Sequence, residues 1–178
     1  MLITEAQREV RSVYAGGFYG QSASSVIWFL SAALGTWYTA RSAIIMLVVG
    51  GFFIFPLTTL LLRVRGGTAA LSPANPFRYL AMQIAFVLPL SMPLVAPVVA
   101  YRITWFYPAM MILVGAHYLP FGTLYGMRSF FALSGILSTS GIALALYLPN
   151  EFSVGGWLTG AVLLIFAVLG YLEARSMA

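Results

Sequence analysis

Long apolar runs separated by short polar breaks organise this sequence of 178 residues. Spanning the hydrocarbon core of a bilayer takes about 20 apolar residues in a helix. Six runs approach that length: Gln21–Tyr38, Ala43–Leu62, Tyr79–Tyr101, Trp105–Met127, Phe130–Leu148 and Val154–Leu172. The pattern therefore predicts an all-α fold, a bundle of six transmembrane helices that forms a single integral membrane domain over residues 1–178.

The segment ahead of the first run has a different character. Met1–Tyr14 carries four charged residues and no early apolar core, which is not the pattern of a cleavable signal peptide. Thr4 followed by Gln7 fits a capping box at a helix N-terminus. We expect a short helix that lies at the membrane surface.

Composition supports a membrane protein. The chain is 61% hydrophobic and 7% charged, with a mean hydropathy of +0.95, whereas a soluble domain carries roughly 25% charged residues. It contains no cysteine, so disulfides and thiol chemistry are excluded. We conclude that the chain is an integral membrane protein.

The distribution of arginine predicts the orientation in the membrane. All nine basic residues are arginines. On the side of the N-terminus the predicted topology places Arg8, Arg11, Arg63, Arg65, Arg78, Arg128 and Arg175. On the opposite side it places Arg41 and Arg102. Because cytoplasmic loops are enriched in basic residues, this predicts a multi-pass protein of the inner membrane with both termini in the cytoplasm. The arginines are too scattered to indicate a nucleic-acid partner.

Two of the predicted spans resemble each other. Ile44–Pro56 aligns with Ala109–Phe121 at an offset of 65 residues, and Gly50 then falls opposite Gly115. Both spans run in the same direction, so the natural repeating unit is a helical hairpin used three times. Chance similarity between apolar spans is the alternative.

Three prolines spaced four residues apart interrupt the third run. Pro89, Pro93 and Pro97 each remove one helical hydrogen bond, and hydrocarbon offers no replacement partner. We therefore expect this span to be bent, with its proline face turned into the bundle. Two interpretations follow: a bent helix buried among its neighbours, with Ser91 satisfying free carbonyls, or a row of free carbonyls that lines a small cavity.

His117 is the one histidine of the chain and falls near the middle of the fourth run. An ionisable group at that depth is a functional candidate, and Tyr118 and Tyr125 lie nearby on the same helix. The alternative is a neutral, hydrogen-bonded structural histidine. Gln83 in the third run is another strong polar group, with interhelical hydrogen bonding as its simplest role. The candidate ligand-binding residues are His117, Tyr118, Tyr125, Gln83 and Ser91.

Enzymatic motifs are missing from the sequence. It contains no phosphate-binding GK[ST] loop, no HExxH motif and no aspartate, and its four acidic residues lie near termini or loop ends. A lone histidine without cysteine cannot form a metal site of the usual kind. We therefore expect no catalytic residues, no cofactor and no metal, and we do not favour an enzyme.

Four runs of the chain resemble a family of small bacterial multi-pass membrane proteins of unknown function. They read ITEAQREVRSVYAGG, GTWYTARSAIIMLVVGGFFIFPLT, NPFRYLAMQIAF and WFYPAMMILVGAHYLPFGTLYGM, and the GAHYLPFGTLYG part is the most distinctive. The resemblance covers most of the chain and agrees with six spans. It implies no activity, substrate or catalytic residue.

Two functional hypotheses remain. In the first, the protein binds or transports a small molecule or lipid through a pocket at the membrane midplane, near His117 and the bent third span. In the second, it is a non-catalytic structural or accessory subunit of a larger membrane complex. The expected partners are the lipid bilayer, a bound lipid or small apolar ligand, and either further copies of the chain or a larger complex.

Overall fold

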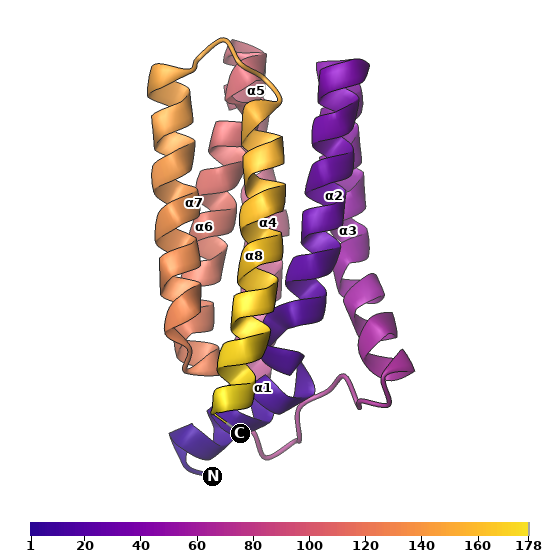
Figure 1. Cartoon of the computed structure of the whole chain (residues 1–178), viewed down its shortest axis with the longest axis vertical. Coiled ribbons are helices and arrows are strands. Elements are labelled where there is room, and N and C mark those ends of the chain that lie inside the picture. The colour runs from indigo at the N-terminus through magenta and orange to yellow at the C-terminus, as the bar shows by residue number, and fades with distance from the viewer. Residues whose placement is uncertain (178) are drawn as a thin grey trace.

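The computed structural model describes residues 1–177, and helices make up most of this part of the chain (Figure 1). The helices are α1 (Ile3–Val13), α2 (Phe18–Trp37), α3 (Ala40–Val64), α4 (Phe77–Ser91), α5 (Val95–Tyr101), α6 (Phe106–Tyr125), α7 (Arg128–Tyr147) and α8 (Val154–Ser176). Short 3₁₀ turns occupy Ala15–Gly17, Met92–Leu94 and Ile103–Trp105. Residues 1–177 contain no β-strand. The predicted all-α fold is confirmed.

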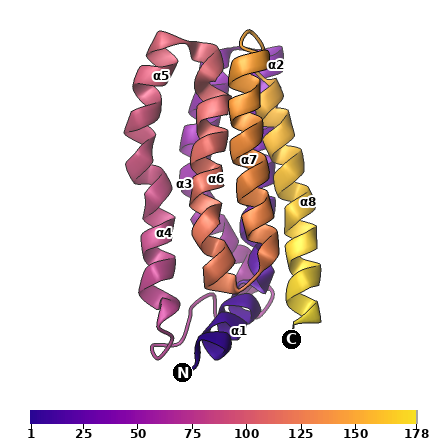
Figure 2. The same ribbon diagram turned by 90° about the vertical axis from the view of Figure 1, so that its left-hand side faces the viewer.

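The long helices lie side by side along one axis, and α1 lies at one end of them (Figures 1 and 2). Both chain termini are at that same end. In Figure 2, α4 and α5 follow one another as a bent leg at the side of the bundle, with α6, α7 and α8 beyond them. The helix boundaries agree with the predicted spans to within a few residues.

The expectation of six apolar spans is wrong in number. Among residues 1–177, four helical segments are long and apolar enough to cross a membrane: Ala40–Val64, Phe77–Tyr101, Arg128–Tyr147 and Val154–Ser176. The helices that fall short are α2 and α6, although each has 20 residues. α2 carries several polar side chains, including the buried Gln21 and Ser31. α6 carries His117, three tyrosines and two prolines, which lower its mean hydropathy.

Small residues set the distance between the inner helices. A Cβ added at Gly156 of α8 would lie 2.8 Å from Cβ of Ala32 on α2. One added at Gly115 of α6 would lie 2.9 Å from the carbonyl oxygen of Ser134 on α7. Lipid tails are as apolar as leucine, so helices in a bilayer associate through close packing and hydrogen bonds. The glycines therefore bring α2 against α8 and α6 against α7.

Buried hydroxyl groups join the same inner helices. Ser31 of α2 is fully buried, and its Oγ lies 2.8 Å from the Ala43 carbonyl oxygen of α3 and 2.6 Å from the Tyr107 hydroxyl of α6. Ser25 Oγ donates to the Gly160 carbonyl of α8 at 2.7 Å. Ser31 thus links three helices and Ser25 links two, and both hydroxyls are satisfied by their partners.

The structure does not contain three equivalent hairpins. α2 packs extensively on α3, and α6 on α7, whereas α4 and α5 make smaller contacts with α6. In the proposed repeat, α2–α3 is the first hairpin and α4–α5 with α6 is the second. The two legs of the second hairpin therefore pack less closely on each other than those of the first. The sequence similarity between α3 and α6 does not correspond to similar packing.

Two side chains of α1 cap the end of α6. Gln7 Nε2 donates to the Thr123 carbonyl at 2.7 Å, and Arg11 donates to the Tyr125 carbonyl at 2.6 Å. The last four carbonyls of a helix lack partners within it and carry partial negative charge, so a cation there is favourable. Gln7 is thus not part of a capping box. Instead, Glu5 accepts the Leu2 backbone N–H at 2.8 Å.

Glu9 ties α1 to the loop between α3 and α4. Its carboxylate accepts hydrogen bonds from the backbone N–H and the hydroxyl of Ser72 and, at 2.9 Å, from the Asn75 amide. Asn75 is 2% exposed and also donates to the Ala6 carbonyl at 3.2 Å. Its Oδ1 accepts the Phe77 N–H at the start of α4. This network fixes where α4 begins.

Gly16 permits the turn from α1 into α2. Its φ is +64°, in the left-handed region, and an added Cβ would lie 2.5 Å from the Gly170 carbonyl oxygen of α8. Only glycine satisfies both the backbone conformation and the close approach. The turn therefore presses the α1–α2 junction against α8.

We expect Gly115→Ala to destabilise the fold because α7 backbone atoms block the new methyl group. Ser134 O and Ser138 N would lie 2.9 and 3.0 Å from it. Overpacking of this kind costs about 1–3 kcal/mol. Gly135→Ala on α7 is the control, since no atom lies within 4 Å of its added Cβ. The melting temperature in detergent should fall for Gly115→Ala and hold or rise for Gly135→Ala; equal values would contradict this packing.

The Glu9 network also predicts a pH dependence of stability. The Ser72 N–H, followed by the Asn75 amide, holds the pKa of Glu9 below its usual 4.5. A depressed carboxyl pKa stabilises the fold above the pKa of the unfolded chain, and this contribution disappears as the pH falls through the folded value. Glu9→Gln should therefore lower the melting temperature near neutral pH, and the difference should shrink in acid. Glu151→Gln in an exposed loop is the control, and a difference that is independent of pH would refute this role.

Candidate functional site

The helical leg from Phe77 to Tyr101 is interrupted in the region of its prolines. α4 ends at Ser91, a 3₁₀ turn follows, and α5 begins at Val95. The Met92 backbone N–H donates to the carbonyls of both Leu88 and Pro89. Pro93 cannot donate to the Pro89 carbonyl, so the tighter turn supplies the missing partner from within the chain. The predicted departure from a regular helix is confirmed.

The predicted direction of the proline face is wrong. Pro89, Pro93 and Pro97 are all exposed. Ser91 donates to the Val87 carbonyl in its own helix at 2.7 Å and does not reach a carbonyl freed by proline. The expectation assumed that neighbouring helices must supply donors. The 3₁₀ turn instead serves the Pro89 carbonyl from within the chain, and the three proline rings face outward.

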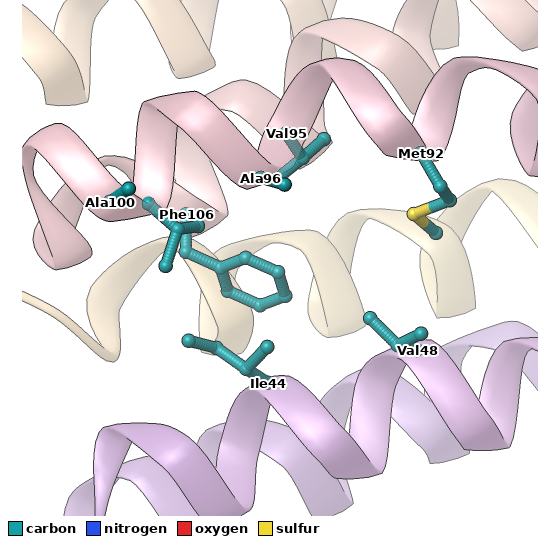
Figure 3. A pocket seen from close by; sticks show the side chains of 8 residues that line it. Ile44, Val48, Met92, Val95, Ala96, Ala100 and Phe106 are labelled. Atoms are coloured by element: carbon teal, nitrogen blue, oxygen red, sulfur yellow. The ribbon is translucent and has the colours of Figure 1, made fainter.

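An apolar cleft of about 420 Å³ lies beside this interruption. α3 forms one wall, and the 3₁₀ turn with α5 forms the other (Figure 3). Phe106 at the start of α6 projects between them. The lining residues are all apolar: Ile44, Val48, Met92, Val95, Ala96, Val99, Ala100 and Phe106. The volume is within the roughly 300–1,000 Å³ of small-molecule sites.

Small side chains on α5 keep the cleft open. Ala96 and Ala100 stand one helical turn apart and are both exposed. Across from them, Ile44 and Val48 point from α3 toward α5 (Figure 3). Larger side chains at the two alanines would fill the space between the walls. These lining residues were not among the predicted site residues, although the spacing of Ala96 and Ala100 is a signal that could have identified this face.

The cleft does not include His117. Its ring lies 5.1 Å from that of Phe121 and 5.6 Å from that of Tyr118 on α6. Nδ1 is buried without a hydrogen-bond partner. The expected hydrogen bond of the histidine to a tyrosine or to a carbonyl freed by proline is not made by Nδ1 within residues 1–177, and the backbone of Ile84 on α4 is the polar group that the ring does meet.

Tyr118 and Tyr125 join His117 in an aromatic cluster. The ring of Phe121 lies 5.4 Å from Tyr118 and 5.7 Å from Tyr125. Phe130 of α7 completes the cluster, 4.8 Å from the Tyr125 ring. Both tyrosines are buried. Such close ring contacts are typical of core packing between two helices.

The other two predicted site residues do not join this cluster. Gln83 is exposed, and Ser91 lies in the interrupted leg. The structure thus brings together His117, Tyr118 and Tyr125 but leaves Gln83 and Ser91 apart. Within residues 1–177, no group of three histidine, cysteine or acidic side chains is placed to hold a metal ion.

A family model identifies the group of proteins to which the chain belongs. The model described as "Family of unknown function (DUF7010)" matches residues 3–173, nearly the whole chain. The chain is therefore a member of that family. Comparisons with curated proteins and with solved structures give no match.

The unpartnered Nδ1 of His117 predicts the effect of replacing its ring. A buried polar atom without a partner costs about 1–3 kcal/mol, and phenylalanine keeps the ring contact with Phe121. We expect His117→Phe to be at least as stable as the parent in thermal unfolding. Ser25→Ala is the comparison, because it removes a satisfied buried hydroxyl and should lose about 1 kcal/mol. A clear loss of stability in His117→Phe would show that the imidazole makes a hydrogen bond that phenylalanine cannot replace, such as one to the Ile84 backbone.

Proposed function

We propose that this protein is a multi-pass membrane protein that holds an apolar chain, such as the acyl chain of a lipid, in the cleft between α3, α5 and α6. The observation that supports this is the cleft itself, whose lining is entirely apolar. A polar ligand buried there would lose its hydrogen bonds to water without replacement. An apolar chain has no such penalty.

Lipid is the natural occupant because of where the cleft opens. Ala96 and Ala100 border it and are exposed, and α5 lies at the side of the bundle toward the end opposite the termini (Figure 2). In a bilayer the medium next to such an opening is hydrocarbon, so an acyl chain can enter sideways without crossing a polar surface.

We further propose how the bundle sits in the membrane. α3, α4–α5, α7 and α8 supply the apolar segments, and α2 and α6 cross with them as inner helices whose polar groups are sheltered by protein. The end of the bundle that carries both termini faces the cytoplasm, and the membrane is the inner membrane. The asymmetry of the arginines supports this orientation.

The alternative function is that of an accessory subunit, in which a transmembrane helix of a partner protein fills the same cleft. The outward apolar surface of the α4–α5 leg favours this reading, because Leu90, Leu94 and Tyr101 are strongly exposed. Exposed apolar surface is also what lipid contact requires. The two readings differ in what co-purifies with the chain.

Filling the cleft tests the proposal. Ala96→Trp should occupy the space between α5 and α3, and Ala143→Trp on the exposed face of α7 is the matched control. We expect native mass spectrometry in detergent to show retained lipid on the parent and on Ala143→Trp. On Ala96→Trp the retained lipid should fall about tenfold. Ala100→Trp gives an independent second variant if Ala96→Trp folds poorly.

The other results of this experiment would refute lipid binding in the cleft or support the accessory subunit. Equal lipid retention in all variants would refute lipid binding in this cleft. A membrane protein that co-purifies with the parent and is lost from Ala96→Trp would instead support the accessory subunit. A photoreactive fatty acid that labels Met92 or Val48 would locate the occupant directly.

A further inference from the structure

A second hollow, of about 790 Å³, lies at the end of the bundle that carries both termini. α1, the C-terminal end of α3 and the C-terminal end of α8 surround it. Four arginines contribute to its lining: Arg8, Arg11, Arg65 and Arg175. They come from three segments that are distant in sequence. We call this hollow the arginine hollow.

Two tyrosines hold the Arg65 guanidinium in place. It donates to the Tyr19 hydroxyl at 3.0 Å and to the Tyr171 hydroxyl at 3.4 Å. Its Cζ also lies 5.8 and 5.6 Å from the centroids of these two rings. The Tyr171 hydroxyl first, and then that of Tyr19, raises the pKa of Arg65. A guanidinium has five N–H donors in a fixed plane, so donors remain for a ligand.

Arg175 concentrates positive charge next to Arg65. Its Cζ lies 5.5 Å from the centroid of the Tyr171 ring, so two guanidinium groups contact the same ring. Arg8 and Arg11 face the hollow from α1. Burial, followed by the charge of Arg8, lowers the pKa of Arg11, and the charge of Glu173, outside the lining, opposes this shift in part. Like charges held this close are relieved by an anion.

The two acidic residues in the lining have other partners. Glu9 is bound to Ser72 and Asn75, and Glu5 accepts the Leu2 N–H. Neither of these contacts involves an arginine. The structure thus builds a concave site with four arginines against two carboxylates, both of which are engaged elsewhere.

We propose that the arginine hollow binds a phosphate group. Guanidinium groups match phosphate oxygens in geometry and charge. The phosphate has two chemically equivalent sources: the headgroup of an anionic lipid at the membrane surface, or a soluble phosphate compound. The site is separate from the apolar cleft and shares no lining residue with it.

The test removes charge and, within residues 1–177, no side-chain hydrogen bond; the contact of the Arg175 guanidinium with the Tyr171 ring is lost with it. Arg8 and Arg175 are both exposed, and Arg65 and Arg11, which hold other elements, stay intact. Arg8→Gln combined with Arg175→Gln is the test variant. Arg63→Gln combined with Arg128→Gln is the control, because these exposed arginines lie at the same end but outside the lining. Both variants change the net charge equally.

The probes are phosphatidic acid, phosphatidylcholine with the same acyl chains, and inorganic phosphate, each titrated against the full chain in detergent. We expect phosphatidic acid to bind the parent more tightly than phosphatidylcholine does. Losing two charge-assisted contacts should weaken this binding at least tenfold in the test variant. The control should stay within about twofold. Native mass spectrometry counts the adducts, and the shift in melting temperature gives the affinity.

Comparing phosphatidic acid with inorganic phosphate distinguishes the two sources of the phosphate group. Binding of phosphatidic acid without inorganic phosphate would assign the site to a lipid headgroup. Binding of both, with the same loss in the test variant, would assign it to phosphate compounds in general. Equal binding by parent and test variant, or no binding of either probe, would overturn the proposal. Lipid retention in the apolar cleft should be unchanged in the test variant, so failure of one proposal leaves the other intact.

Discussion

Close packing through small residues and shared hydroxyls is the constraint on which this bundle depends. In a bilayer, burial of apolar surface does not distinguish a neighbouring helix from lipid. Association must come from contacts that lipid cannot make, such as the hydrogen bond between Ser31 and Tyr107 and the close packing of Gly115 against the α7 backbone. These contacts concentrate on α2 and α6. Both helices bring buried hydroxyl groups to these contacts, Ser31 from α2 and Tyr107 from α6.

The scarcity of such close contacts along the α4–α5 leg explains why the cleft lies beside α5. The α4–α5 leg makes only limited contact with the rest of the bundle, and that contact is to α6. Its prolines weaken the helix, and the 3₁₀ turn at Met92–Leu94 recovers the hydrogen bond of the Pro89 carbonyl. The leg therefore has no need to press against α3. Ala96 and Ala100 leave the intervening space unfilled, and the cleft follows from weak association rather than from a dedicated binding motif.

The helices could be predicted from sequence because their length and apolar character are local properties. The direction of the proline face could not, because it depends on whether the chain itself can satisfy a freed carbonyl. Nor could the pairing of helices, since α3 and α6 are similar in sequence yet pack differently. His117 was predicted as a ligand-binding residue because it is a lone ionisable group, but its ring lies among aromatic side chains. The apolar cleft carries no titratable residue, so a search for polar chemistry could not find it.

The arginines show that one residue type can serve several purposes at the same end of the bundle. Counted along the chain, they indicate only orientation. In the structure, Arg11 completes the hydrogen bonding at the end of α6, whereas Arg65 is held by two tyrosines at the rim of the hollow. Glu9 lies in the lining of the same hollow, but its carboxylate accepts hydrogen bonds from Ser72 and Asn75 and none from a guanidinium group. The guanidinium groups of the lining therefore do not use their N–H donors on this carboxylate.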